Sequence, residues 1–526
     1  MKLIYNTNDK PKFGKLIVFA LQQVLAIITA TIVVPIITNN AVNSNPEIPF
    51  DISMSPAAAL LGAGIGTLVY LLFTKFKSPV FLGSSFAFLG SMAAAFAGAA
   101  TAALGYAGLI IGAVLAGLVY VIIAVIVKFA GTGWLNKLMP AVVIGPTVAI
   151  IGLSLAGNAV GDLQKSAATE PLAEKVAEAQ KEYNEKKEKY SDAEKLYDEA
   201  LLSEELLNEA KAELDTATAN LATAKRNQNI NTIICVACGI VTLLVTIVCS
   251  TFGKKMVKLI PFICGIGAGY GLGVVLTVIG TVAKVPVLQV IDFSPITSLF
   301  TNFSIESIVS IPSLTIVKAF GVFGQNIGGA KGFFSYVLAV AVAYVPVAFV
   351  VFAEHIADHK NISSIIEKDL LTEPGLHRTL LGDGVGSMAG ALVGGCPNTT
   401  YGESVACVAI TKNASIATIF TAAIMAIIIA FFTPFVAFVN TIPSYVMGGV
   451  CMALYGFIAV SGLKMIQKVD LGLNKNLFVV STILIAGIGG LALTFGKITI
   501  TPVACALILG IIINLILNKA KETEEK

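Results

Sequence analysis

Long stretches of uninterrupted apolar residues constrain this chain more than any other feature of its sequence. Gly105–Val127 is the clearest example, with no charged residue and an apolar surface on every face of a helix. About 20 such residues cross the hydrocarbon core of a bilayer. We predict fourteen membrane-spanning segments, near residues 14–37, 55–75, 79–98, 105–128, 138–157, 230–251, 256–282, 333–356, 376–395, 397–412, 415–439, 443–463, 475–496 and 498–518.

Composition supports the same class of protein. The chain has 526 residues, of which 56% are hydrophobic and 13% are charged, whereas soluble domains carry about 45–50% and 25%. These values exclude a soluble enzyme, a disordered chain and a disulfide scaffold. They also exclude a nucleic-acid partner, which would require a basic surface. The sequence therefore predicts an all-α polytopic membrane protein, and no cofactor motif or nucleophile–base pair indicates an enzyme.

The distribution of lysine predicts the orientation. Lysines cluster before the first span and in alternate loops, whereas the short loops Asn39–Ser53 and Ala97–Leu104 contain neither lysine nor arginine. Positive charge in short loops marks the cytoplasmic side. We therefore expect a multi-pass protein of the cell membrane with both termini in the cytoplasm.

Charged residues are concentrated in one insert between the fifth and sixth spans. Fifteen acidic and ten basic residues lie between Lys165 and Arg226. Apolar residues recur there every seven positions, which is typical of two packed helices. We predict that residues 165–227 form an extracellular coiled-coil hairpin that turns near Leu201–Ser203, with Ser203 as a helix N-cap. The hairpin is either a passive decoration or a docking or dimer-stabilising element.

The two halves of the chain repeat the same interruptions. The third span of the first half begins with Pro79–Ser84, and the third span of the second half begins with Pro397–Glu403. The fifth spans both place a proline, Pro140 or Pro443, five residues before a glycine. Seven spans per half put the halves in opposite orientations. Matching breaks of this kind indicate an inverted-repeat transporter with a binding site at mid-membrane.

Three acidic residues lie in or beside predicted spans. Glu354 and Asp358 are four residues apart and share a helix face, and Glu403 follows the glycine in the second interruption. An intramembrane carboxyl group is a candidate functional site. It can exchange a proton or accept hydrogen bonds from a ligand. Alternatively, Glu354 ends its span in water.

Other patterns favour packing over chemistry. His355 and His359 are four residues apart, but Ile356 stands where a zinc-protease motif needs a glutamate and no third ligand is evident. We therefore expect no metal there. Cys235 and Cys238 form a CxxC on an apolar helix, where we expect small packing residues. The alternating glycines of Gly265–Gly273 indicate close helix packing.

At these residues the chain resembles the uracil permeases of the nucleobase–cation symporter family, also called nucleobase–ascorbate transporters. The resemblance extends over the whole chain except the hairpin. It is carried by the segments Gln22–Ala26, Gly83–Phe88, Ala353–Ile356, Gly395–Glu403, Val446–Gly449 and Tyr455–Gly456.

The resemblance implies a fold of seven plus seven spans with short antiparallel strands in the third and tenth. A core domain would comprise residues 14–128 and 333–439. A gate domain would comprise residues 138–282 and 443–518, and two gate domains would form a homodimer.

The resemblance also implies the site. Glu354 and Glu403 would bind a nucleobase directly, the backbone at Phe86 and Gly402 would add hydrogen bonds, and Ala30 and Tyr455 would line the pocket. Apart from the resemblance, we expect the carboxyl groups of Glu354, Asp358 and Glu403 to carry the coupling proton, because a desolvated carboxyl can exchange one in the physiological range. The chain departs from family patterns at three positions, where Gln23 and Asp358 replace a histidine and Cys451 replaces a serine.

The expected function is import of uracil with a proton, or with sodium, by alternating access. Purine-transporting relatives often carry glutamine where Glu403 stands, which favours uracil. Three alternatives remain at this stage: a purine or xanthine carrier of the same family, an anion transporter with the same fold, and a surface receptor acting through the hairpin.

Overall fold

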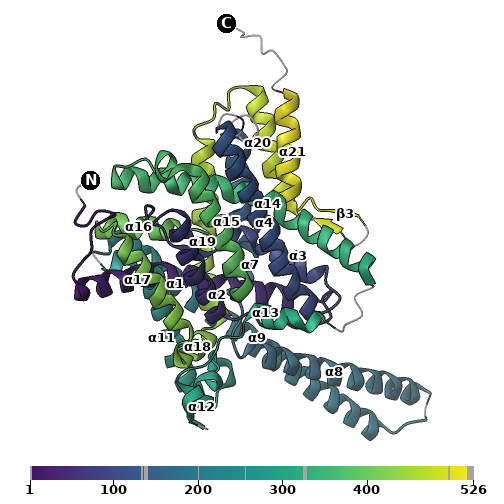
Figure 1. The fold of residues 1–526 in the computed structure, drawn as a ribbon. Coiled ribbons are helices and arrows are strands. Elements are labelled where there is room, and N and C mark those ends of the chain that lie inside the picture. Colours follow the sequence, from purple (N-terminus) through teal and green to yellow (C-terminus); the bar gives the residue numbers. More distant parts are fainter. Residues whose placement is uncertain are drawn as a thin grey trace.

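The computed structural model describes residues 3–131, 134, 140–199, 201–254, 256–301, 303–323, 329–495 and 498–517 (Figure 1). Three of the expected spans have one terminus outside the described residues: residues 138–139 begin the span at 138–157, and residues 496 and 518 end the spans at 475–496 and 498–518. Within the described part, eight helical segments are long and apolar enough to cross a membrane. Their helices are α1 (Phe13–Asn43), α2 (Pro56–Phe73), α4 (Ala102–Ala130), α6 (Ala141–Ser154) continued by α7 (Ala156–Asp162), α9 (Glu204–Phe252), α11 (Pro261–Val282), α14 (Gly329–Ile366) and α19 (Ser444–Ile466).

Shorter helices occupy the other expected spans. They are α3 (Leu89–Ala97), which continues the 3₁₀ turn η1 (Phe86–Phe88), α15 (Leu376–Gly394), α16 (Gly402–Thr411), α17 (Ile416–Ala430), α20 (Asn474–Ile488) and α21 (Pro502–Leu517). The number of membrane crossings therefore remains a prediction, because length and composition alone support only the eight longer segments.

The remaining elements connect these helices. They are α8 (Thr169–Asp198), α10 (Met256–Leu259), η2 (Pro286–Leu288), α12 (Ser294–Thr301), η3 (Ile305–Ser307), α13 (Thr315–Ala319), η4 (Phe320–Val322), the π-turn η5 (Leu371–Gly375), α18 (Thr433–Asn440) and the strands β1 (Leu82–Ser84), β2 (Asn398–Thr400), β3 (Leu493–Phe495) and β4 (Ile498–Ile500).

Two helices are longer than the apolar runs that predicted them. The span expected at 333–356 belongs to α14, which continues to Ile366. The span expected at 230–251 is the second half of α9, whose first half is the second arm of the hairpin. Hydropathy marks only the apolar part of a helix, whereas the backbone hydrogen-bond ladder can continue through polar residues. In the first half of α9 most of these residues favour the helical conformation.

The hairpin of α8 and α9 extends away from the rest of the molecule (Figure 1). Ser203 caps the second arm as expected, because its hydroxyl accepts a hydrogen bond from the backbone N–H of Leu206. Lys186 and Lys189 both pair with Glu213 across the two arms, at 3.1 and 2.8 Å. These pairs lower the pKa of the Glu213 carboxyl and fix the register of an antiparallel hairpin.

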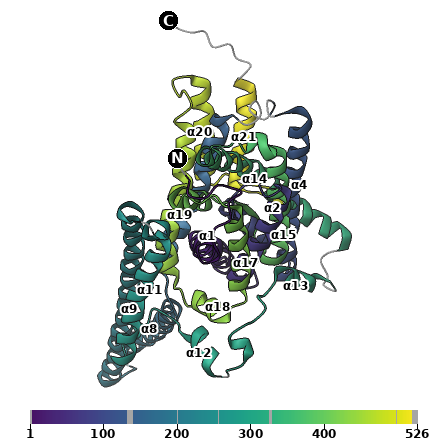
Figure 2. The same ribbon diagram turned by 60° about the vertical axis from the view of Figure 1, so that its left-hand side comes forward.

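Glycines allow two helix pairs to approach closely. A Cβ atom at Gly62 of α2 would lie 2.5 Å from the carbonyl oxygen of Gly390 in α15, so a side chain at this crossing would separate the helices. In α11, a Cβ at Gly265 or Gly269 would meet Thr246 or Thr242 of α9, whereas no atom lies within 4 Å of one at Gly267. One face of the glycine stripe therefore serves packing, as predicted. Figure 2 shows α9 beside α11.

Candidate functional site

Two short strands from opposite halves of the chain pair in the interior. β1 and β2 are antiparallel, with Gly83 opposite Thr399, at the two positions where the resemblance implied strands. Every residue of β1 and β2 is buried. Their pairing satisfies backbone groups that hydrocarbon could not.

Side chains within β2 and directly after it hold this strand pair in place. Tyr401 donates a hydrogen bond to the carbonyl oxygen of Ser84 at 2.7 Å, and the amide of Asn398 donates to the carbonyl oxygen of Gly62 at 3.0 Å. The strands are therefore fastened to each other and to α2. The 3₁₀ turn η1 and helix α16 begin just after β1 and β2, which places the first residues of both at the ends of the pair.

A cavity of about 470 Å³ lies beside the strand ends. Phe86 of η1, Gly402 and Glu403 of α16, and Glu354 and Asp358 of α14 line it. Glu354 is exposed and Glu403 is partly exposed. Because both side chains line the cavity, this is where they are accessible. We call it the carboxylate cavity.

The other wall of the carboxylate cavity comes from different helices. It includes Val148 of α6, Phe262 of α11 and Leu454 and Phe457 of α19. Lys258 and Ser461 also contribute to the lining. The cavity thus contains three carboxylates and one lysine among otherwise mostly apolar residues.

Glu354 does not end its helix, because α14 continues for twelve residues beyond it. The alternative that the membrane span ends there in water concerns the membrane boundary and stays a prediction. Asp358 follows one turn later on the same face, is 7% exposed, and accepts a hydrogen bond from the hydroxyl of Thr400 at 2.8 Å. This bond ties α14 to β2.

Two residues that the resemblance assigned to the pocket do not line this cavity. Ala30 is 2% exposed and packs among apolar residues of α1 and its neighbours. Tyr455 is also 2% exposed, and its ring meets the edge of Phe86 with centroids 6.3 Å apart. The side chain of Phe86 and not that of Tyr455 faces the cavity.

The two histidines of α14 lie away from the cavity in a buried polar network. Nδ1 of His355 lies 2.7 Å from a carboxylate oxygen of Asp383, and its Nε2 lies 3.0 Å from the hydroxyl of Thr379. Nε2 of His359 lies 2.7 Å from the hydroxyl of Tyr70. Each imidazole is thus engaged in hydrogen bonds, which explains the histidines without a metal ion.

Sequence reasoning missed Asp383. The signal was available, because Asp383 is an acidic residue inside the span expected at 376–395. It differs from Glu354 and Glu403 in being 1% exposed. Its place opposite His355 indicates a role in holding α14 against α15.

Gln23 connects α1 to the first turn of α16. Its amide donates to the hydroxyl of Ser404 at 2.5 Å, and the same hydroxyl accepts from the backbone N–H of Phe81 at 3.1 Å. Ser404 is adjacent to Glu403. Gln23 therefore positions the backbone that presents this glutamate.

Comparison with known proteins agrees with this architecture. The permease family matches residues 14–181 and 214–495. The match includes the part of each hairpin arm that adjoins the rest of the chain, but not the turn of the hairpin. The chain is 33% identical to the uracil permease of Bacillus caldolyticus over 527 residues, covering 100% of this chain and 97% of that protein. It is also 33% identical over 527 residues to the uracil permease of Bacillus subtilis, covering 99% and 97%. The transmembrane domain of a cyanobacterial bicarbonate transporter, BicA, has a similar fold with a TM-score of 0.50 and 14% identity, covering 98% of this chain and 100% of that one.

The relatives are named permeases and the chain contains several long apolar helices, which together define a multi-pass membrane transport protein and not an enzyme. The chain belongs to the permease family whose curated members include these uracil permeases.

Proposed function

We propose that this permease imports uracil together with a proton by alternating access. The observation that carries the proposal is the meeting of Glu354 and Glu403, from opposite halves of the chain, in one cavity. The names of the two Bacillus relatives support uracil as the substrate.

The chemistry of the cavity suits a planar base. Uracil offers two N–H donors and two carbonyl acceptors. The carboxylates of Glu354 and Glu403 would accept the N–H groups, the backbone at Gly402 and Phe86 would serve the carbonyls, and the Phe86 ring supplies an apolar surface. An analogue that leaves one of these groups unpaired would bind more weakly. The same carboxylates disfavour an anion as the substrate.

The proton would be carried by the carboxyl groups of Glu354, Asp358 and Glu403. Coupling requires that proton and uracil each strengthen binding of the other by the same factor. Entry of one proton down a potential of about 100 mV contributes about 2.3 kcal/mol, which corresponds to about 50-fold accumulation of uracil.

Movement would occur between two domains, and the cavity lies where they meet. Residues 14–128 and 333–439, the proposed core, supply α1, η1, α14 and α16. Residues 138–282 and 443–518, the proposed gate, supply α6, α11 and α19. With both termini in the cytoplasm, Lys258 marks the cytoplasmic end of the cavity, and this conformation faces inward. We place the protein in the cell membrane as a homodimer through the gate domain, with the hairpin 165–227 outside.

The test is uptake of radiolabelled uracil by cells or proteoliposomes that contain the full chain. Uptake should make the external medium more alkaline, and purines should compete poorly. Glu403→Gln should abolish most uptake at normal expression, whereas Glu47→Gln, a change at an exposed glutamate outside the cavity, should not. Wild-type uptake by Glu403→Gln would refute the role of Glu403. Unchanged external pH together with sodium-dependent uptake would replace the proton with sodium.

A further inference from the structure

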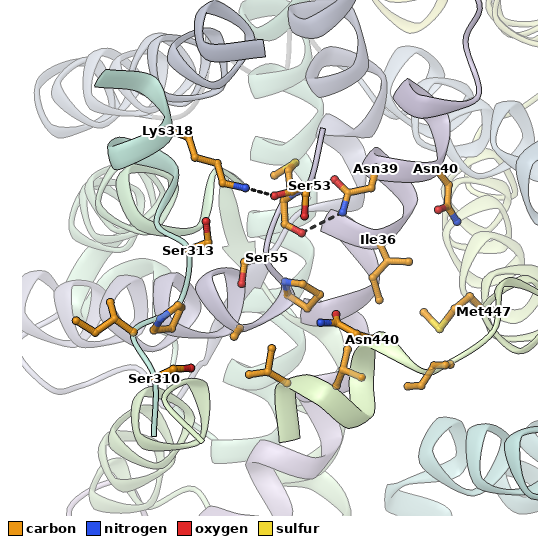
Figure 3. Close-up of a pocket in the computed structure, with 18 of the residues that line it drawn as sticks. Ile36, Asn39, Asn40, Ser53, Ser55, Ser310, Ser313, Lys318, Asn440 and Met447 are labelled. Atoms are coloured by element: carbon orange, nitrogen blue, oxygen red, sulfur yellow. Dashed lines mark hydrogen bonds between the residues drawn. The ribbon is translucent and has the colours of Figure 1, made fainter. Parts of the chain in front are cut away.

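A second cavity, of about 450 Å³, lies at the other end of α1. Asn39 and Asn40 of α1 line it with Ser53 and Ser55, which precede and cap α2, and with Asn440 at the end of α18. Figure 3 shows side chains from α1, α13 and α18 gathered around it. We call it the serine–asparagine cavity.

The two cavities follow the same pair of helices. On α1, Ala26 lines the carboxylate cavity and Ile36 the serine–asparagine cavity, a separation of about 15 Å along the helix. On α19, Leu454 lines the carboxylate cavity and Met447 the serine–asparagine cavity, a separation of about 10 Å along the helix. α1 belongs to the proposed core and α19 to the proposed gate, so both cavities lie between the two domains.

Buried apolar residues lie between these positions on both helices. They are Val33 of α1 and Val450 and Cys451 of α19, and all three are 0% exposed. In the proposed orientation the serine–asparagine cavity therefore faces the outside, on the route that a substrate must take to the carboxylates.

The polar groups of this cavity complement those of the first. Lys318 of α13 donates to the carbonyl oxygen of Ser53 (Figure 3), and its ammonium lies 5.0 Å from the centre of the Tyr106 ring. Burial lowers the pKa of Lys318. Within the described residues, no acidic side chain lines the cavity, and the Asn440 amide is exposed without a hydrogen-bond partner. The cavity thus offers a lysine ammonium, which only donates, beside hydroxyl and amide groups, which donate and accept, whereas the carboxylate cavity offers mainly acceptors.

We propose that the serine–asparagine cavity is an entry site for the transported base. Its donors, chiefly Lys318 and Asn440, match the carbonyl oxygens of a neutral planar pyrimidine. Because both cavities exist in one conformation, a single chain binds two bases at once. Binding is tight at the carboxylates and weaker at the entry site, part of whose lining, such as Asn440, is exposed. This proposal rests on the proposed function and adds a second binding site to it.

Equilibrium dialysis of the purified full chain with radiolabelled uracil tests the proposal by stoichiometry. We expect two uracil molecules per wild-type chain, in two affinity classes. Lys318→Met should remove the weaker class or weaken it by about tenfold, which is 1.4 kcal/mol, and should leave the tight class unchanged. Asn440→Leu, on the opposite wall, should act in the same way. Lys318→Arg should retain both classes, and so should the control Lys331→Met, at an exposed lysine that lines neither cavity.

Glu403→Gln should have the opposite effect on uracil binding, because it should abolish the tight class of sites and leave the weak class unchanged. Retention of one class in each variant also shows that the variant is folded. One class in the wild type, removed by Glu403→Gln, overturns the entry site and leaves the proposed function standing. Absence of uracil binding refutes the proposed function and the entry site with it. A weak class of uracil sites that survives both Lys318→Met and Asn440→Leu overturns the entry site. The entry site is also overturned if the cavity binds phosphate instead of uracil and Lys318→Met abolishes that phosphate binding.

Discussion

Replacement of Ser404 by alanine removes a single buried oxygen that joins three elements. Its hydroxyl accepts hydrogen bonds from the Gln23 amide of α1 and from the backbone N–H of Phe81, next to β1. Ser404 and Phe81 are 0% exposed and Gln23 is 2% exposed, so water cannot replace the lost acceptor without a rearrangement.

The expected cost follows from these partners. The N–H of Phe81 has no other hydrogen-bond acceptor among the described residues, and an orphaned buried donor costs about 1–3 kcal/mol. Gln23 keeps a weaker bond to the carbonyl oxygen of Ser404 at 3.3 Å, so its loss is nearer about 1 kcal/mol. Ser404→Ala should therefore destabilise the protein by about 2–4 kcal/mol, and it should weaken uracil binding because Glu403 is the preceding residue.

Thermal unfolding followed with a thiol-reactive dye suits this chain, because all eight cysteines are free and most are buried. Ser404→Ala should lower the unfolding midpoint, whereas Ser298→Ala, at an exposed serine in α12, should leave it unchanged. In a double-mutant cycle, Gln23→Leu combined with Ser404→Ala should cost less than the sum of the two single changes. Strict additivity would show that the two side chains do not interact, and the reasoning would fail.

Three further outcomes are expected from other parts of the structure. Gly62→Ala should destabilise by about 1–3 kcal/mol through overpacking at the α2–α15 crossing, whereas Gly271→Ala, which meets open space, should be neutral or stabilising; equal thermal midpoints would contradict the crossing. Asp383→Leu should destabilise the protein by about 3 kcal/mol or more, since it removes the hydrogen-bond partner of the buried His355. Asp383→Asn should cost less, because the amide oxygen of the asparagine can still accept from His355. A lower thermal midpoint for Asp383→Asn than for Asp383→Leu would contradict this reasoning. Replacing residues 183–217 by a short turn should leave uracil uptake intact, and lost uptake at normal expression would give the hairpin an essential role.

The sequence was informative wherever chemistry and local pattern coincide. Glu354 and Glu403 could be recognised because charge is costly inside an apolar span, and the prolines and glycines before Ser84 and Glu403 indicated extended backbone. The resemblance supplied the strand pairing and named Phe86 and Gly402, which also line the cavity.

What the sequence could not supply depends on which face of each helix meets a neighbour. Ala30 and Tyr455 were assigned by position in a motif, but both are 2% exposed and neither is among the residues that line the cavity. The contact between His355 and Asp383 joins residues 28 positions apart on different helices, and no local pattern predicts such a pair. The serine–asparagine cavity was missed for the same reason, because its lining comes from five separate segments of common polar residues.

The unbroken course of α9 has a mechanical consequence. Because α9 is one continuous helix, a tilt of the half that is predicted to span the membrane would also move the hairpin. The arm from residue 228 to Glu204 is about 36 Å long, and a rigid tilt of about 10° would carry its tip through about 6 Å. Spin or fluorescent labels near the turn of the hairpin could therefore follow the proposed transport cycle.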